Sequence, residues 1–146
     1  MKIEIDIDEK YPDTEVMIRA NKLNPDVEKL IAMMRMVNMQ IGVHKNDETY
    51  LLDVGKILYI EAVERKTFVY TSEETYESDL KLYEIEQELV KQDFIRISKQ
   101  SIVNIRMIKS LKSDINRKIR ITLKNDEQII VSRMYSDELR RKLGLK

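Results

Sequence analysis

The chain of 146 residues contains no cysteine and a single histidine, His44. Without cysteine it has neither a disulfide framework nor a thiolate metal site, and one histidine makes a structural zinc site an unfavourable interpretation. Three glycines and two prolines are too few for a flexible linker or a low-complexity tract. No apolar run approaches the length that spans a bilayer, and the charged N-terminus is unlike a signal peptide. These absences predict a soluble, cytoplasmic protein.

Catalytic motifs are equally scarce. His44 lies in an alternating stretch, where a structural or exposed role is the ordinary expectation. Glu84, Glu86 and Glu88 alternate around a short predicted helix, which is typical of a solvated face rather than of an acid/base pair. The glycines stand far apart, so there is no glycine-rich phosphate loop. The sequence therefore predicts a protein that is not an enzyme and that uses no cofactor, metal or small-molecule substrate.

Charge is distributed unevenly, although the formal net charge is zero. Residues 1–94 contain 12 Lys and Arg against 21 Asp and Glu, a balance of −9. Residues 95–146 contain 14 Lys and Arg against 5 Asp and Glu, a balance of +9. Basic segments in fixed positions are what a polyanion such as nucleic acid requires. The alternative is an ordinary solvated surface, on which Lys and Arg are common.

The placement of the cations favours nucleic acid. They recur at predicted strand ends and connections, namely Arg65 and Lys66, Lys99, Arg106, Arg117 and Lys118, and Arg133. Cations at loop tips can reach phosphates or enter a groove. Arg133 can offer a planar, bidentate fork to guanine, and Lys99 and Gln100 can donate hydrogen bonds to base edges.

Residues 1–40 are expected to form a β-β-α segment. The period of two over residues 3–7, where isoleucines alternate with acids, predicts a half-buried strand, and residues 15–20 predict a return strand. A helix is expected from residue 24 to about residue 38, because Asn24 can cap it and a proline follows at the first helical position.

The predicted helix is rich in methionine, and this pattern has two interpretations. Val27, Leu30 and Met34 fall on one apolar stripe, which is typical of core packing. Met33 and Met36 lie off that stripe and widen the apolar surface, which favours a dimer contact or a regulatory contact.

From residue 41 onward the pattern changes to short strands bounded by polar turns. Strands are predicted at 41–45, 49–54, 57–63, 67–71, 75–77, 94–97, 102–104, 108–112, 118–123 and 128–131. Helices are expected only near residues 82–90 and 134–143. The sequence therefore predicts a mainly β fold with few helices, in which residues 41–146 form an antiparallel domain.

Four stretches then identify a family. They are Ile57–Ala62, Phe94–Asn104, Ile108 and Val131–Tyr135. In this order and spacing they resemble the LytTR-type DNA-binding domain, the output domain of bacterial transcription regulators. The resemblance covers residues 41–146 and implies a ten-stranded antiparallel β fold. It also implies that loops, rather than a recognition helix, enter successive major grooves at direct-repeat promoter sites and bend the DNA.

The resemblance carries the DNA contacts over to specific positions. The first contact loop falls on Glu64, Arg65, Lys66 and Thr67, the second on Ser98, Lys99 and Gln100, and the third contact on Arg133. The family commonly has His-Arg-Ser in the second loop. Here Lys99 keeps the charge but loses the planar fork. Arg96 and Asn104 also match the family pattern, and we expect structural roles for both, with Asn104 closing a turn.

The resemblance also predicts partners. Double-stranded promoter DNA is the expected ligand, bound by a homodimer. Residues 1–40 are too short for a phosphoacceptor receiver domain, which normally needs about 100 residues or more. Control by a membrane-protein regulator is the expectation instead. The alternative to a DNA-binding regulator is a protein–protein adaptor that uses the basic face and the methionine-rich helix.

Overall fold

The computed structural model describes residues 1–37 and 39–145. The chain divides into two compact units, Met1–Met34 and Arg35–Lys146. None of the described helices is long and apolar enough to cross a membrane.

The first unit contains the start of helix α1 (Pro25–Val37). The helix begins as the sequence predicts, because the Asn24 side-chain oxygen accepts a hydrogen bond from the Val27 backbone N–H at 3.0 Å. Asp26 and Glu28 occupy its first turn, next to the positive end of the helix dipole. The side chains of Met33 and Met36, on which the dimer interpretation depends, lie outside the described residues.

The two predicted strands of this unit are a wrong prediction. Residues 1–24 contain turns and extended segments but no strand at 3–7 or 15–20. The side chains of Ile3, Ile5 and Ile7 are 78%, 80% and 91% exposed. An isolated two-stranded hairpin is marginal in water unless a hydrophobic face packs on something. Alternation alone therefore does not form the strands.

The second unit contains ten strands and two short helices among its described residues. The strands are β1 (Gln40–Lys45), β2 (Glu48–Asp53), β3 (Ile57–Val63), β4 (Lys66–Thr71), β5 (Thr75–Ser78), β6 (Phe94–Arg96), β7 (Ser101–Asn104), β8 (Ile108–Ser113), β9 (Ile119–Leu123) and β10 (Gln128–Val131). The helices are α2 (Leu82–Leu89) and α3 (Arg133–Lys142), and the 3-10 turns are η1 (Val54–Lys56), η2 (Val90–Gln92), η3 (Ile105–Met107) and η4 (Ile115–Arg117).

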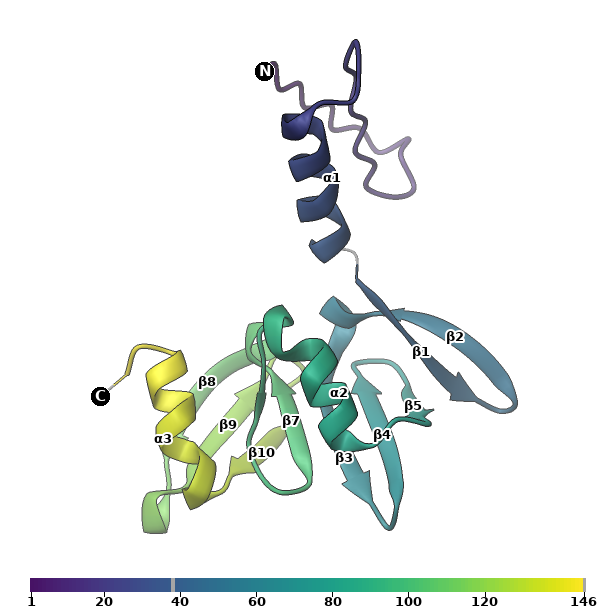
Figure 1. Cartoon of the computed structure of the whole chain (residues 1–146). Helices are drawn as coiled ribbons and strands as arrows, with labels where there is room; N and C mark the ends of the chain where they lie inside the picture. Colours follow the sequence, from purple (N-terminus) through teal and green to yellow (C-terminus); the bar gives the residue numbers. More distant parts are fainter. Residues whose placement is uncertain (38, 146) are drawn as a thin grey trace. The chain divides into compact units, whose positions relative to one another are not determined.

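The strands form two sheets. One has seven strands in the order β2-β1-β5-β4-β3-β7-β6, and the other has three in the order β10-β9-β8. Every pairing between these strands is antiparallel. Figure 1 shows α2 beside the larger sheet and α3 beside the smaller one. The mainly β, antiparallel fold predicted from the sequence is confirmed.

Two hydrophobic clusters meet at β3, an interior strand of the larger sheet that lies between β4 and β7. Ile57 and Ile60 pack with Leu89 of α2 in the first cluster. Leu58 packs in the second cluster with residues of the smaller sheet and with Leu139 of α3. Burying each such side chain stabilises the fold by about 1.5–3 kcal/mol. Because β3 is covered on both faces, the loops that leave the central strands start from a rigid base.

Candidate nucleic-acid interface

The loop between β6 and β7 holds the second set of predicted contact residues, Ser98 to Gln100. Ser98 Oγ accepts a hydrogen bond from the Gln100 backbone N–H at 3.1 Å, which closes the loop on itself. Arg96 Nη1 donates to the Lys99 carbonyl oxygen at 2.7 Å, and its Nε donates to Glu86 Oε2 at 3.0 Å. The carbonyl of Lys99 is thus held inward, while the side chains of Lys99 and Gln100 are exposed.

The first predicted contact loop lies next to the second. The Ala62 backbone N–H donates to the Gln100 carbonyl oxygen at 2.8 Å, which joins the end of β3 to the β6–β7 loop. The β3–β4 hairpin then closes through Glu64 and Arg65, whose φ angles are +49° and +71°. Both side chains are exposed, whereas Thr67 is only 6% exposed. Thr67 therefore packs within the sheet, on which the loop rests.

Arg133 stands at the first position of α3. The Ser132 backbone N–H donates to the Ile97 carbonyl oxygen at 2.9 Å, so the start of α3 is fixed to the base of the β6–β7 loop. Ser132 is the N-cap residue, but its side chain makes no capping hydrogen bond. A cation at this position opposes the helix dipole and does not stabilise the helix. An anion bound there would be favoured by the dipole, the open N–H groups and Arg133 together.

These elements surround one concavity of about 670 Å³. Its lining residues are Ser98, Lys99, Gln100, Asn116, Lys118, Ser132, Arg133 and Met134. The second loop and Arg133, 33 or more positions apart in the chain, therefore share a site. The first loop borders this site but does not line it. Figure 1 shows the β3–β4 turn, the β6–β7 loop and the start of α3 along the lower edge of the second unit.

The site list drawn from the sequence missed Asn116, Lys118 and Met134. Lys118 was visible as one of the basic residues between strands, but nothing in the local sequence shows that the β8–β9 turn meets the start of α3. We call the five cations Arg65, Lys66, Lys99, Lys118 and Arg133 the basic edge.

The cations of the basic edge are largely free of carboxylate partners. Within the part of the chain that the structure describes, only Lys66 has one, with its Nζ 3.9 Å from Glu77 Oε1. Arg106, another cation between strands, is instead paired, with its Nε 2.8 Å from Asp93 Oδ2. The basic edge thus presents unneutralised positive charge, which a polyanion can use.

Asn104 has the structural role that the sequence predicts. It is 1% exposed, and its Nδ2 donates to the Ile57 carbonyl oxygen at 2.8 Å. Its Oδ1 accepts from the Arg106 backbone N–H at 3.1 Å and so caps η3. The prediction that Asn104 closes a turn is confirmed.

The opposite ends of the same strands are acidic. A second depression, of about 490 Å³, is lined by residues that include Glu73, Glu74 and Glu127. Glu73 and Glu74 follow the far end of β4, and Glu127 precedes the far end of β10. Burial raises the pKa of the nearby Tyr59 well above its usual range, and a hydrogen bond with Glu127 is the second-largest cause. The Tyr59 ring stacks on Tyr70 with centroids 4.4 Å apart. Lys45 also lines the depression and pairs with Glu74, so three acids face one base there and this end is less favourable for phosphate than the basic edge.

His44 lies beside a single carboxylate, that of Asp79. In β1, its Nε2 lies 3.0 Å from Asp79 Oδ1, and the side chain is 36% exposed. The described residues contain no group of three or more potential ligands that could hold a metal ion.

The second unit is an antiparallel β domain whose loops carry, within the described residues, unpaired cations at one set of strand ends, a surface that suits a polyanion. The chain belongs to the LytTr DNA-binding domain family, whose model matches residues 47–144. It carries the DNA-binding domain of a class of transcription regulators.

Known proteins resemble the chain in sequence and in structure. An uncharacterized HTH-type transcriptional regulator of Staphylococcus aureus strain MSSA476 is 28% identical over 99% of both chains, and one of strain N315 is also 28% identical over 99% of both. Among solved structures, the LytTr DNA-binding domain of a putative methyl-accepting/DNA response regulator from Bacillus cereus is 30% identical, with a TM-score of 0.69. The match covers 73% of this chain and 97% of that chain.

The names of the relatives refer to a helix-turn-helix, but the described fold of this chain is different. The helices α1, α2 and α3 are separated from one another by strands. No two of them can form a helix-turn-helix in the described residues. The candidate interface is therefore built from loops and from the start of α3.

Proposed function

We propose that the protein is a sequence-specific transcription regulator that binds double-stranded promoter DNA through its basic edge. One observation carries this proposal: Lys99, Gln100 and Arg133 line the same concavity, and the cations among them have no carboxylate partner in the described structure. Side chains that converge from two separate segments suit the reading of adjacent bases in one groove.

Within this site the residues have different roles. Arg133 offers a planar fork to guanine O6 and N7, and Lys99 and Gln100 donate to base edges. Arg65 and Lys66 lie on the neighbouring hairpin and bind phosphates or a second groove. Ser98, whose hydroxyl accepts from Gln100, and the buried Thr67 position their loops.

Finer features follow as further proposals. The first loop borders the concavity without lining it, and we propose that the two contact different stretches of the duplex, with loops inserted into successive major grooves. We propose that two protomers occupy adjacent direct repeats and bend the DNA, which allows contacts along a longer stretch of duplex. Residues 1–40 would then supply a dimer contact or a regulatory contact, and residues 41–146 the DNA-binding domain. A membrane-protein regulator is the proposed source of control.

The test is a titration of the protein on its own upstream region against a scrambled duplex, at several salt concentrations. Arg133→Ala should lose about 1–3 kcal/mol of specific binding, and Arg133→Lys should regain only part of it. Arg141→Ala is the matched control, because Arg141 is exposed in the last turn of the same helix. Equal binding of both duplexes by the wild-type protein, or no binding at all, would favour the adaptor function instead.

A further inference from the structure

Two hairpin turns at the edge that carries the interface share an unusual choice of residue. The β3–β4 turn has φ angles of +49° at Glu64 and +71° at Arg65. The β8–β9 turn has +57° at Asn116 and +63° at Arg117. Positive φ at both central residues is the geometry of the type I′ turn, in which the second position strongly favours glycine. Both turns place arginine there.

A third turn of this geometry contains residues that are suited to a positive φ angle. The β1–β2 hairpin turns through Asn46 and Asp47, with φ angles of +50° and +67°. Asparagine and aspartate tolerate the left-handed conformation because their short polar side chains hydrogen-bond locally. A long arginine side chain has no such compensation. The backbone of the β8–β9 turn therefore does not explain Arg117.

Neither do ion pairs explain Arg117. The turn is closed by backbone hydrogen bonds from Lys118 to the Ile115 carbonyl at 3.2 Å and from Asp114 to the Lys118 carbonyl at 2.8 Å. The nearby Asp114 carboxylate is engaged by Arg120 Nη2 at 3.0 Å. Arg117 is exposed and, among the described residues, has no carboxylate within 4 Å.

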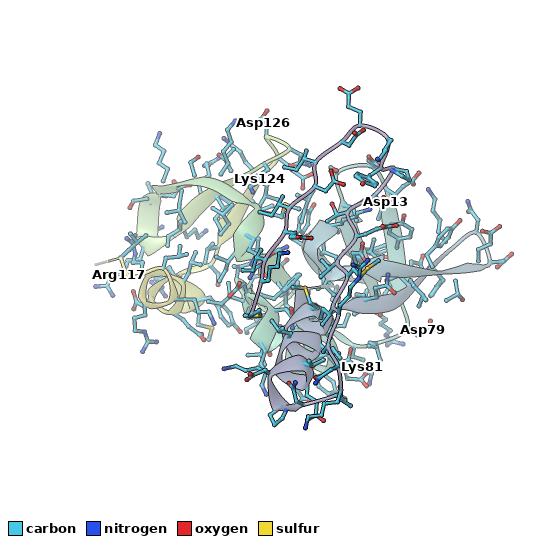
Figure 2. The ribbon with its side chains drawn as sticks, turned by 90° about the horizontal axis from the view of Figure 1, so that it is seen from above. Asp13, Asp79, Lys81, Arg117, Lys124 and Asp126 are labelled. Carbon is cyan, nitrogen blue, oxygen red and sulfur yellow. The ribbon has the colours of Figure 1, made fainter. Side chains whose placement is uncertain are left out.

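The position of the turn indicates an anionic partner. Asn116 and Lys118, on either side of Arg117, line the concavity that also contains Lys99 and Arg133. Arg117 itself does not line it. Figure 2 shows Arg117 beside α3 on the outside of the unit, whereas Lys124 and Asp126, beyond the other end of β9, lie well away from it.

We infer that the β8–β9 turn is a further DNA-contacting element, in which Arg117 binds a backbone phosphate flanking the groove that Lys99 and Arg133 read. This inference rests on the proposed function. A phosphate is the target because the side chain lies outside the concavity, and contacts to phosphates position a protein on DNA without reading sequence. The strained backbone at Arg117 is retained because glycine would remove the contact.

The experiment replaces Arg117 by the residue that the turn prefers. Arg117→Gly should raise the urea midpoint of unfolding, because glycine adopts positive φ without strain. The same variant should bind DNA about five- to tenfold more weakly near 0.1 M salt, with the salt slope smaller by about 0.9, which is the value of one phosphate contact. Specific and scrambled duplexes should be affected equally. Arg117→Gln, which keeps the strain and removes the charge, should weaken binding similarly without the gain in stability.

Asp47→Gly is the matched control, since it relieves the same backbone conformation in a turn that is not part of the interface. It should gain stability without losing DNA affinity. Wild-type affinity and salt slope in both Arg117 variants, while Arg133→Ala loses binding, would overturn this inference and leave the proposed function intact. A loss confined to the specific duplex would overturn the assignment to a phosphate. A wild-type protein that binds no duplex would overturn both.

Discussion

Arg96 provides a test of how the second contact loop is held in place. Its guanidinium joins Glu86 of α2 to the carbonyl oxygens of the loop, with Nη1 2.7 Å from the Lys99 oxygen and 3.5 Å from the Ser98 oxygen. The side chain is 17% exposed. Arg96→Gln removes the charge and is too short to reach both partners. The loop would then lose its internal donor but none of its exposed cations.

The expected loss of stability follows from these contacts. A hydrogen bond from a charged donor contributes about 1.5–3 kcal/mol, and this applies to the bond with the Lys99 carbonyl. The pair with Glu86 adds at most about 1 kcal/mol, because the Glu86 side chain is 40% exposed and regains water. We therefore expect Arg96→Gln to lower the free energy of unfolding by about 2–3 kcal/mol.

The effect on DNA binding separates positioning from contact. A less ordered loop should weaken specific binding, but the salt slope should not change because no phosphate contact is lost. Urea unfolding followed by circular dichroism and DNA titrations at three salt concentrations measure the two effects. Lys91→Gln, which removes an exposed charge in η2, is the control for net charge. Unchanged stability together with a slope smaller by about one would refute the positioning role and place Arg96 on the DNA.

Two further predictions concern the N-terminal segment and acid stability. A fragment of residues 39–146 should fold and bind specific DNA at least as tightly as the full chain, because both hydrophobic clusters are built from residues within this range. Sedimentation and two-repeat titrations that match the full chain would exclude residues 1–38 as the dimer contact. A hydrogen bond from the Ile115 N–H and then Arg120 lower the pKa of Asp114 below its ordinary 3.8, so its stabilisation is present above that value and disappears as pH falls through the lowered pKa. The stability gap between the wild type and Asp114→Asn should therefore close at acid pH in urea titrations from pH 6 to pH 2.5.

The sequence predicts the strands well where local pattern and tertiary structure agree. The strands predicted at 57–63 and 128–131 match β3 and β10 residue for residue, because β-branched runs bounded by polar turns have few alternatives. The strand predicted at 3–7 has an equally regular pattern but no strand forms, and its isoleucines are exposed. Periodicity indicates which face of a strand can be buried. It does not show that a partner exists.

The order of the strands in the sheets does not follow from the local sequence pattern. β3 pairs with β7 through Tyr59 opposite Val103, and β1 pairs with β5 through His44 opposite Glu77. These pairings join residues more than 30 positions apart, and the packing of the two hydrophobic clusters decides them. For the same reason the sequence did not show that Asn116 and Lys118 share a concavity with Lys99. The basic residues were visible, but the edge that gathers them was not.

The charge asymmetry that matters for function is set by strand ends rather than by sequence position. Arg65 and Lys66 belong to the acidic part of the chain, residues 1–94, yet they lie on the basic edge. Glu127 belongs to the basic part, yet it lies at the acidic end of the fold. In an antiparallel sheet each turn lies at one of the two ends of the strands, so alternate turns lie at the same end. Placing mainly cations in the turns at one set of strand ends and mainly acids in the turns at the other makes a polar domain from a chain of zero net charge. Exchanging the charges of two turns at opposite edges would abolish this polarity at constant composition.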